Sequence, residues 1–160
     1  MFDLFGIDRI WPGYDKITAT MKSGEKARAL EAETKRSILS LLPELYPDTR
    51  FIPYIGVHEF EALLYSDIET LSRTTGIALP PLQKILNECG EPEEINSSPE
   101  GAPSKRLLKL APSYRKIAMG VSISKATSID VIRGRCPHFN AWLGVLEATK
   151  RSGFPASGDA

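Results

Sequence analysis

The chain has 160 residues, with 20 acidic and 20 basic side chains and a hydrophobic fraction of 42%. These values are typical of one globular domain with its own core, and no apolar run reaches the roughly 18 residues of a membrane span. The first residues contain no signal-peptide pattern, and the two cysteines, Cys89 and Cys136, form no paired motif. We therefore predict a cytoplasmic protein with reduced thiols and no membrane partner.

The N-terminal part of the chain predicts a strand followed by a long helix. Residues 1–5 are apolar around Asp3 and stop at a glycine, which indicates a short strand. From 23 to 45, apolar residues recur at steps of three and four, which is typical of an amphipathic helix. Ser23 is its expected N-cap, and Pro43 is expected to end or kink it.

A second strand is expected at residues 51–57, directly before a helix at 59–65. Pro53 cannot donate a ladder hydrogen bond, so this strand is expected at a sheet edge or only after the proline. A strand that leads into a helix forms a junction of the kind where α/β proteins place their sites. Functional side chains are therefore expected at this junction.

Prolines divide the rest of the chain into short predicted helices, at 80–89, 91–96, 104–110, 114–119, 124–135 and 138–150. Pro92, Pro103 and Pro137 suit the first turn of a helix, where no amide donor is missed. The predicted organisation has three parts. Residues 1–66 form an α/β segment, 67–151 a basic helical part of the same domain, and 152–160 a disordered tail.

Three acidic residues are candidate catalytic residues and metal ligands. Glu59 and Glu61 follow the second predicted strand, and Asp3 lies in the first, where an unpaired buried carboxylate costs free energy. Carboxylate oxygens suit Mg²⁺ or Mn²⁺, which can activate water for attack on a phosphodiester. Alternatively, the two glutamates stabilise a helix N-terminus, and Asp3 lies in water beyond its strand.

A zinc site is a weaker interpretation of the histidines. The pair His58-Glu59 begins like a zinc-protease motif, but the second histidine that this motif needs is replaced by Ala62. A set made of His58, His138 and Cys136 lacks the paired spacing of structural zinc sites. The sequence therefore favours carboxylate ligands over zinc.

Charge is divided unevenly along the chain. Residues 1–100 have 10 basic and 17 acidic side chains, whereas residues 101–151 have 10 basic and 2 acidic. A basic segment of this kind is typical of contact with a polyanion, although a solvated helix face has the same pattern. Nearby aromatic residues such as Phe139 and Trp142 are expected in the core rather than against bases. The candidate nucleic-acid-binding residues are Lys105, Arg106, Lys116, Arg133, Arg135 and His138.

Several short motifs, in one order and spacing from about residue 1 to 146, resemble the uncharacterised bacterial family DUF4276. These motifs are Arg50-Phe51-Ile52-Pro53-Tyr54-Ile55, His58-Glu59-Phe60-Glu61-Ala62-Leu63-Leu64-Tyr65-Ser66-Asp67, Pro92-Glu93-Glu94-Ile95-Asn96, Ala102-Pro103-Ser104-Lys105-Arg106 and Arg133-Gly134-Arg135-Cys136-Pro137-His138-Phe139-Asn140-Ala141-Trp142-Leu143. Unrelated motifs that recur in one order are a specific signal of family membership.

The resemblance implies a Toprim-type nuclease domain similar to the nuclease half of OLD-family proteins, acting with an ABC- or AAA-type ATPase in phage defence or DNA processing. In that pattern Asp3 matches an acid of a later strand, Phe5 stands where a second acid is usual, and Glu61 resembles a further site acid. The strand and glutamate-bearing turn that open the pattern are absent. The resemblance therefore also implies a truncated chain, which would be inactive without a principal ligand.

These observations predict an α/β fold, an incomplete Toprim-like sheet with a helical C-terminal part. The predicted function is a nuclease that acts on DNA or RNA with a partner ATPase, using Mg²⁺ or Mn²⁺ bound by Asp3, Glu59 and Glu61. The alternative is a non-catalytic subunit that binds nucleic acid or the ATPase.

Overall fold

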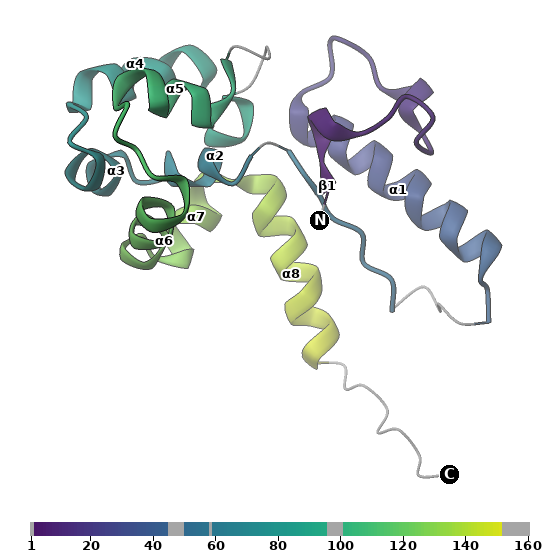
Figure 1. Ribbon diagram of the computed structural model, residues 1–160. Helices are drawn as coiled ribbons and strands as arrows, with labels where there is room; N and C mark the ends of the chain where they lie inside the picture. The colour runs from purple at the N-terminus through teal and green to yellow at the C-terminus, as the bar shows by residue number, and fades with distance from the viewer. Residues whose placement is uncertain (1, 45–49, 58, 96–100, 152–160) are drawn as a thin grey trace.

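The computed structural model describes residues 2–44, 50–57, 59–95 and 101–151 (Figure 1). The expected α/β fold is wrong, because the chain is mostly helical and the described residues contain no Toprim-like sheet. Strands β1 (Phe2–Asp3) and β2 (Ile55–Gly56) form a parallel pair, with Phe2 opposite Ile55. Each predicted strand is shortened for a local reason. A 3-10 helix at Leu4–Gly6 follows β1, and Pro53 precedes β2.

The N-terminal lobe consists of this strand pair and the long helix α1 (Ser23–Leu41). Ala27 and Leu30 of α1 are buried against Leu4, Ile55 and Val57, which form the core of the lobe. The predicted helix is confirmed, but it ends at Leu41, shortly before Pro43, whose ring disfavours a helical residue before it.

The helical lobe contains the described residues from 59 to 151. Its elements are α2 (Glu61–Leu64), α3 (Ile68–Thr75), α4 (Leu79–Cys89), the 3-10 helix η3 (Pro92–Glu94), α5 (Pro103–Leu110), α6 (Lys116–Ala126), α7 (Ile129–Arg135) and α8 (Pro137–Arg151). Large apolar side chains from α2 to α6, including Tyr65, Leu82 and Leu107, form its core. In Figure 1, α1 and β1 lie on one side, α2 to α7 on the other, and α8 extends from between them.

Several predicted boundaries needed correction. The helix expected at 91–96 is only the short η3, and those expected at 114–119 and 124–135 are replaced by α6 and α7. The break before α7 is set by Ser128, whose hydroxyl accepts a hydrogen bond from the Val131 amide. Helix α3 was not predicted. It is capped by Asp67 and ends at Gly76, whose φ of 75° suits a glycine.

Two consecutive glutamates of η3 cap the N-termini of α8 and α1, and the contact of Glu94 with α1 joins the two lobes. Glu93 accepts hydrogen bonds from the amides of His138 (2.8 Å) and Phe139 (2.9 Å), in the first turn of α8. Glu94 accepts from the amide (3.1 Å) and hydroxyl (2.9 Å) of Ser23, the first residue of α1. The prediction that Ser23 is the N-cap is wrong: Lys22 is the N-cap, and Ser23 is the first helical residue, whose amide is capped from the other lobe. A carboxylate suits these positions because the first amides of a helix have no partner within it.

A stack of rings lies at the same junction. Tyr54, just before β2, stacks on His138 at 5.3 Å between ring centroids and on Trp142 at 4.5 Å. His138 is buried, and its Nε2 lies 3.1 Å from a Glu31 carboxylate oxygen and 3.2 Å from the Ile55 carbonyl oxygen. Both partners are acceptors, so Nε2 holds a proton. The N-terminus of α8 is thus bound to α1 and β2 through side chains.

Removing the Glu93 carboxylate should destabilise the N-terminus of α8. Glu93→Ala leaves one buried and one partly buried amide without acceptors, so we expect the free energy of unfolding to fall by about 2–3 kcal/mol. Urea denaturation followed by circular dichroism measures this change. Glu88→Ala, which removes an exposed α4 acid 3.9 Å from Lys84, should cost less than about 0.5 kcal/mol. Equal effects of the two substitutions would contradict the capping role.

Candidate functional site

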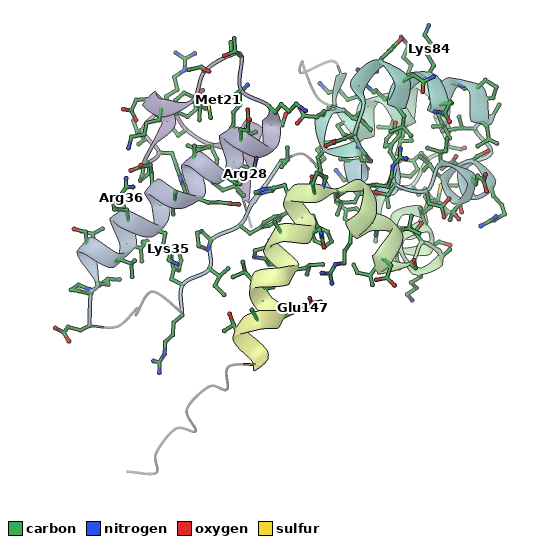
Figure 2. The ribbon with its side chains drawn as sticks, turned by 180° about the vertical axis from the view of Figure 1, so that it is seen from behind. Met21, Arg28, Lys35, Arg36, Lys84 and Glu147 are labelled. Atoms are coloured by element: carbon green, nitrogen blue, oxygen red, sulfur yellow. The ribbon has the colours of Figure 1, made fainter. Side chains whose placement is uncertain are left out.

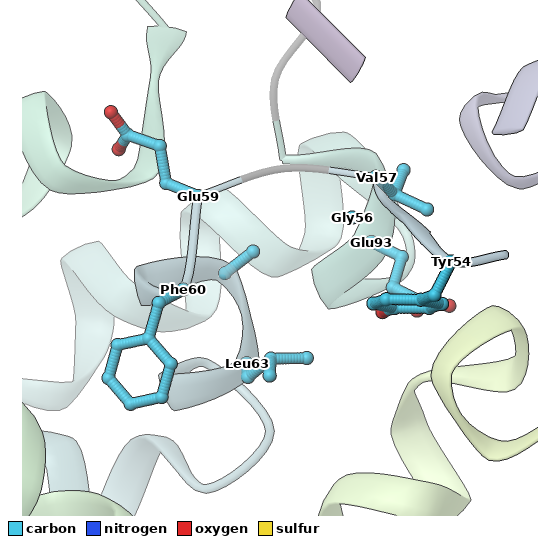
Figure 3. Close-up of a pocket in the computed structure, with 8 residues that line it drawn as sticks. Tyr54, Gly56, Val57, Glu59, Phe60, Leu63 and Glu93 are labelled. Carbon is cyan, nitrogen blue, oxygen red and sulfur yellow. The ribbon is translucent and has the colours of Figure 1, made fainter. Parts of the chain in front are cut away.

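The candidate site lies where the chain passes from β2 into α2. A pocket there is lined by Tyr54, Gly56, Val57, Glu59, Phe60, Ala62, Leu63 and Glu93. Figure 3 shows Glu59 and Phe60 at one end of this group and Tyr54 with Glu93 at the other. Glu59 and Phe60 directly precede α2, and Glu61 is its first residue. Glu59 and Glu61 thus lie at the β2–α2 junction where the sequence placed them, and their role as site residues stays a prediction.

Glu61 is the unusual carboxylate of this junction. Its exposed fraction is 0%, and neither carboxylate oxygen has a hydrogen-bond partner. Lys116 of α6 supplies a countercharge, with Nζ 3.3 Å from Glu61 Oε2, and the Lys116 side chain is 59% exposed. A buried carboxylate without hydrogen bonds costs free energy, and one partly exposed ammonium offsets only part of that cost. Glu61 can therefore accept a further cation or donor.

Glu59 already has a structural partner. Its carboxylate accepts a hydrogen bond from the Ser104 amide at 3.0 Å, in the first turn of α5. Partial burial acts to raise the pKa of Glu59. The Ser104 amide and hydroxyl, followed by the charges of Lys116 and Lys105, outweigh burial and hold that pKa below its usual value. The helix-capping alternative is thus realised, but at α5 rather than at the helix that follows Glu59 in sequence.

Two tyrosines, Tyr65 and Tyr114, lie near the Glu61 carboxylate. The sequence did not predict them as site residues. The hydroxyls of Tyr114 and Tyr65 are buried without a hydrogen-bond partner. Burial, then the charges of Glu61 and Glu59, raise the pKa of Tyr114 to about 12. Tyr114 therefore keeps its proton at neutral pH and is a hydrogen-bond donor near Glu61. The run Tyr114-Arg115-Lys116 was a signal for this cluster, since it puts a phenol beside two cations.

The third predicted ligand, Asp3, is described by its backbone alone. Asp3 lies opposite Gly56 in the strand pair, and Gly56 is two residues before His58. His58 lies outside the described residues, and so does its possible role as a zinc ligand. No group of three or more His, Cys, Asp or Glu side chains suited to a metal occurs in the part of the chain whose side chains are described. The triad of Asp3, Glu59 and Glu61 therefore stays a prediction.

The predicted basic residues divide between two places. Lys105 and Lys116 both act on the charge of Glu59, and Arg106, on the same helix as Lys105, donates from Nε to the Gly101 carbonyl at 2.7 Å. Arg133 is bound to Glu147 at 2.6 Å and to Asn140 at 2.7 Å, with Glu147 on α8 (Figure 2). Arg135 is exposed at the end of α7, and His138 is buried between the lobes. Only the first group adjoins the candidate site.

The lowered pKa of Glu59 predicts a window of pH-dependent stability. A group whose pKa is lower in the folded state stabilises it above the unfolded pKa, and loses that contribution as pH falls through the folded value. We expect the difference in unfolding free energy between wild type and Glu59→Gln to be largest near neutral pH and to shrink below about pH 4.5. Denaturation series in a chelator measure it. Ser104→Ala should give an intermediate difference, whereas a difference that grows on acidification would contradict the assignment.

Comparisons with known proteins agree with the family resemblance of the motifs. Among the described residues, no helix has both the length and the apolarity needed to cross a membrane. No curated protein and no solved structure gives a match to the chain. One family model, described as a domain of unknown function (DUF4276), matches residues 1–147. This match covers most of the chain, including the β2–α2 junction and all of the predicted basic residues, so the chain belongs to the DUF4276 family.

Proposed function

We propose that this chain binds nucleic acid and hydrolyses its phosphodiester bonds, with a divalent metal bound by Glu61 and Glu59 at the β2–α2 junction. The observation on which the proposal depends is the Glu61 carboxylate, which is buried with no hydrogen bond to either oxygen and with Lys116 as its partly exposed countercharge. Such oxygens suit Mg²⁺ or Mn²⁺, which needs only one or two protein carboxylates besides water and substrate oxygens. When bound, the ion supplies an activated water and charge for the transition state.

The cationic side chains around Glu61 have a separate role in this proposal. Lys116 lies 3.3 Å from Glu61 and is largely exposed, so its ammonium can bind a backbone phosphate beside the carboxylate. Lys105 approaches from the first turn of α5 and acts on the charge of Glu59. Tyr114, which keeps its proton, can donate a hydrogen bond to a nonbridging oxygen. These groups would orient and neutralise the phosphodiester.

The charge pattern of the helical lobe supports the binding half of the proposal. Residues 101–129 contain six basic and no acidic side chains. They include α5 and α6, both of which contact α2 at the junction. A surface with one sign of charge concentrates a polyanion near the site. Binding of the phosphate backbone follows from this pattern without any assumption about the metal.

A second candidate function is a non-catalytic nucleic-acid-binding subunit. It is favoured by the hydrogen bond that the Glu59 carboxylate already accepts from the Ser104 amide at the N-terminus of α5. If that bond persists, Glu61 alone faces the ion, and Lys116 remains its countercharge. The partner ATPase expected from the family resemblance stays a prediction in both versions.

Metal binding tests the first candidate directly. Titration with Mn²⁺, followed by calorimetry and thermal unfolding, should show binding and a higher melting temperature for the wild type. Glu61→Gln should lose both responses and lower the rate of plasmid or oligonucleotide cleavage by about 100-fold. Without metal, the same variant should be at least as stable as the wild type, because it removes a buried charge.

Glu69→Gln is the matched control, since it makes the same carboxylate-to-amide change at an exposed glutamate of α3. It should leave the Mn²⁺ response and cleavage unchanged. A wild type that neither binds Mn²⁺ nor cleaves, but retains nucleic-acid affinity, would leave only the non-catalytic function.

Salt dependence tests the phosphate contacts. If Lys105 contacts a phosphate, Lys105→Gln removes that contact. The magnitude of the slope of log affinity against log salt concentration should then decrease by about 0.7–0.9. Lys84→Gln is the control, because Lys84 lies on α4 at the end of the helical lobe away from α1 (Figure 2) and faces solvent. Fluorescence anisotropy at several salt concentrations measures both slopes. Equal slopes for the two variants would remove Lys105 from the interface.

A further inference from the structure

Phe60 is an exposed aromatic ring between the two glutamates of the junction. Its exposed fraction is 43%, which is unusual for a ring that also lines a pocket. The ring lies against α6 at Gly120, where a Cβ would come within 3.2 Å of Phe60 Cε1. The absence of a side chain at Gly120 therefore lets the ring approach the helix closely, and a Cβ there would require the ring to shift.

Lys116 lies on the face of α6 against which the Phe60 ring packs. Lys116 stands four residues before Gly120, so both positions point in nearly the same direction from the helix axis. Ile117 and Val121 occupy the adjoining face, with exposed fractions of 82% and 46%. We name Phe60, Ile117 and Val121 the apolar strip. Lys116 begins the same helix as Ile117 and Val121, and its ammonium contacts Glu61 at 3.3 Å.

We propose that the substrate of this site is single-stranded nucleic acid, with an unpaired base stacked on Phe60 while its phosphate contacts Lys116. The inference rests on the proposed nucleic-acid function and adds the form of the substrate. A single strand exposes the faces of its bases, which stack on aromatic side chains regardless of sequence. A duplex hides those faces within its stack and presents only phosphates and groove edges to the same surface.

The alternation of apolar surface and cation favours a single strand over a protein partner. Each nucleotide has one apolar ring and one negative charge, which matches Phe60 next to Lys116. Residues 101–129, which include α5 and α6, contain no acidic side chain, so the acids near Phe60 are the two proposed metal ligands Glu59 and Glu61. Ile117 and Val121 extend the apolar surface along α6, where a neighbouring base can lie.

The test compares two oligonucleotide forms on the full chain. Anisotropy in a chelator, which prevents metal-dependent cleavage, measures affinity for a labelled oligothymidine of about 20 nucleotides and for a mixed-sequence duplex of the same length. Phe60→Leu keeps an apolar side chain but removes the aromatic face, so single-strand affinity should fall about tenfold while duplex affinity changes less than twofold. Phe60→Trp should keep or increase single-strand affinity. Ile129→Ala, an exposed apolar change on α7, should affect neither form.

The outcomes separate this inference from the proposed function. If Phe60→Leu lowers the affinity for single strand and duplex equally, or lowers neither, base stacking on Phe60 is overturned. The wild type would still bind nucleic acid, so the proposed function would remain. A wild type that binds no nucleic acid would remove the proposed function and this inference together. Self-association of the wild type in sedimentation, abolished by Phe60→Leu without a change in single-strand affinity, would reassign the apolar strip to a protein interface and overturn the proposal.

Discussion

The structure depends on glutamates that satisfy helix amides at long range. Glu93 and Glu94 are adjacent in one 3-10 helix, yet each caps a different helix, α8 through His138 and Phe139 and α1 through Ser23. Because the first amides of a helix have no partner within it, each carboxylate gains hydrogen bonds and a favourable dipole. One turn of chain thereby fixes the N-terminal ends of two helices from different lobes, and the aromatic stack on Tyr54 follows from that placement.

Side chains that bind backbone groups also limit the sheet, which has two strands in the described part of the chain. The Ile55 amide donates to a Glu31 carboxylate oxygen at 2.7 Å, and the Ile55 carbonyl oxygen lies 3.2 Å from His138 Nε2. Side chains of α1 and α8 thus occupy backbone groups of β2 that a third strand would otherwise use. An exposed strand edge attracts further strands, and covering it with helices is a common way to prevent this. The α/β prediction failed because strand patterns reveal which residues are extended, but not what satisfies their edges.

The sequence predicted what local patterns determine. Apolar periodicity located α1, and prolines located the starts of α5 and α8 at Pro103 and Pro137. Contacts between distant residues escaped it: Glu94 meets Ser23 across 71 positions, and Glu59 meets Ser104 across 45. In the candidate site, the sequence identified the two glutamates but not Tyr114, because a buried phenol beside a carboxylate is visible only after α6 has packed on α2.

Glu61 is notable because the other glutamates at these junctions have amide donors. Glu59, Glu93 and Glu94 each cap a helix, whereas both oxygens of Glu61 are buried without a hydrogen bond. Packing alone would favour an apolar residue there, since a buried ion pair rarely stabilises more than an apolar pair of equal volume. Lys116 is exposed enough to leave Glu61 for water or phosphate, and its departure would leave a buried carboxylate that needs another cation. In the proposed function, cation exchange at Glu61 and phosphate binding by Lys116 would therefore be physically coupled, which would connect the metal and the substrate in one site.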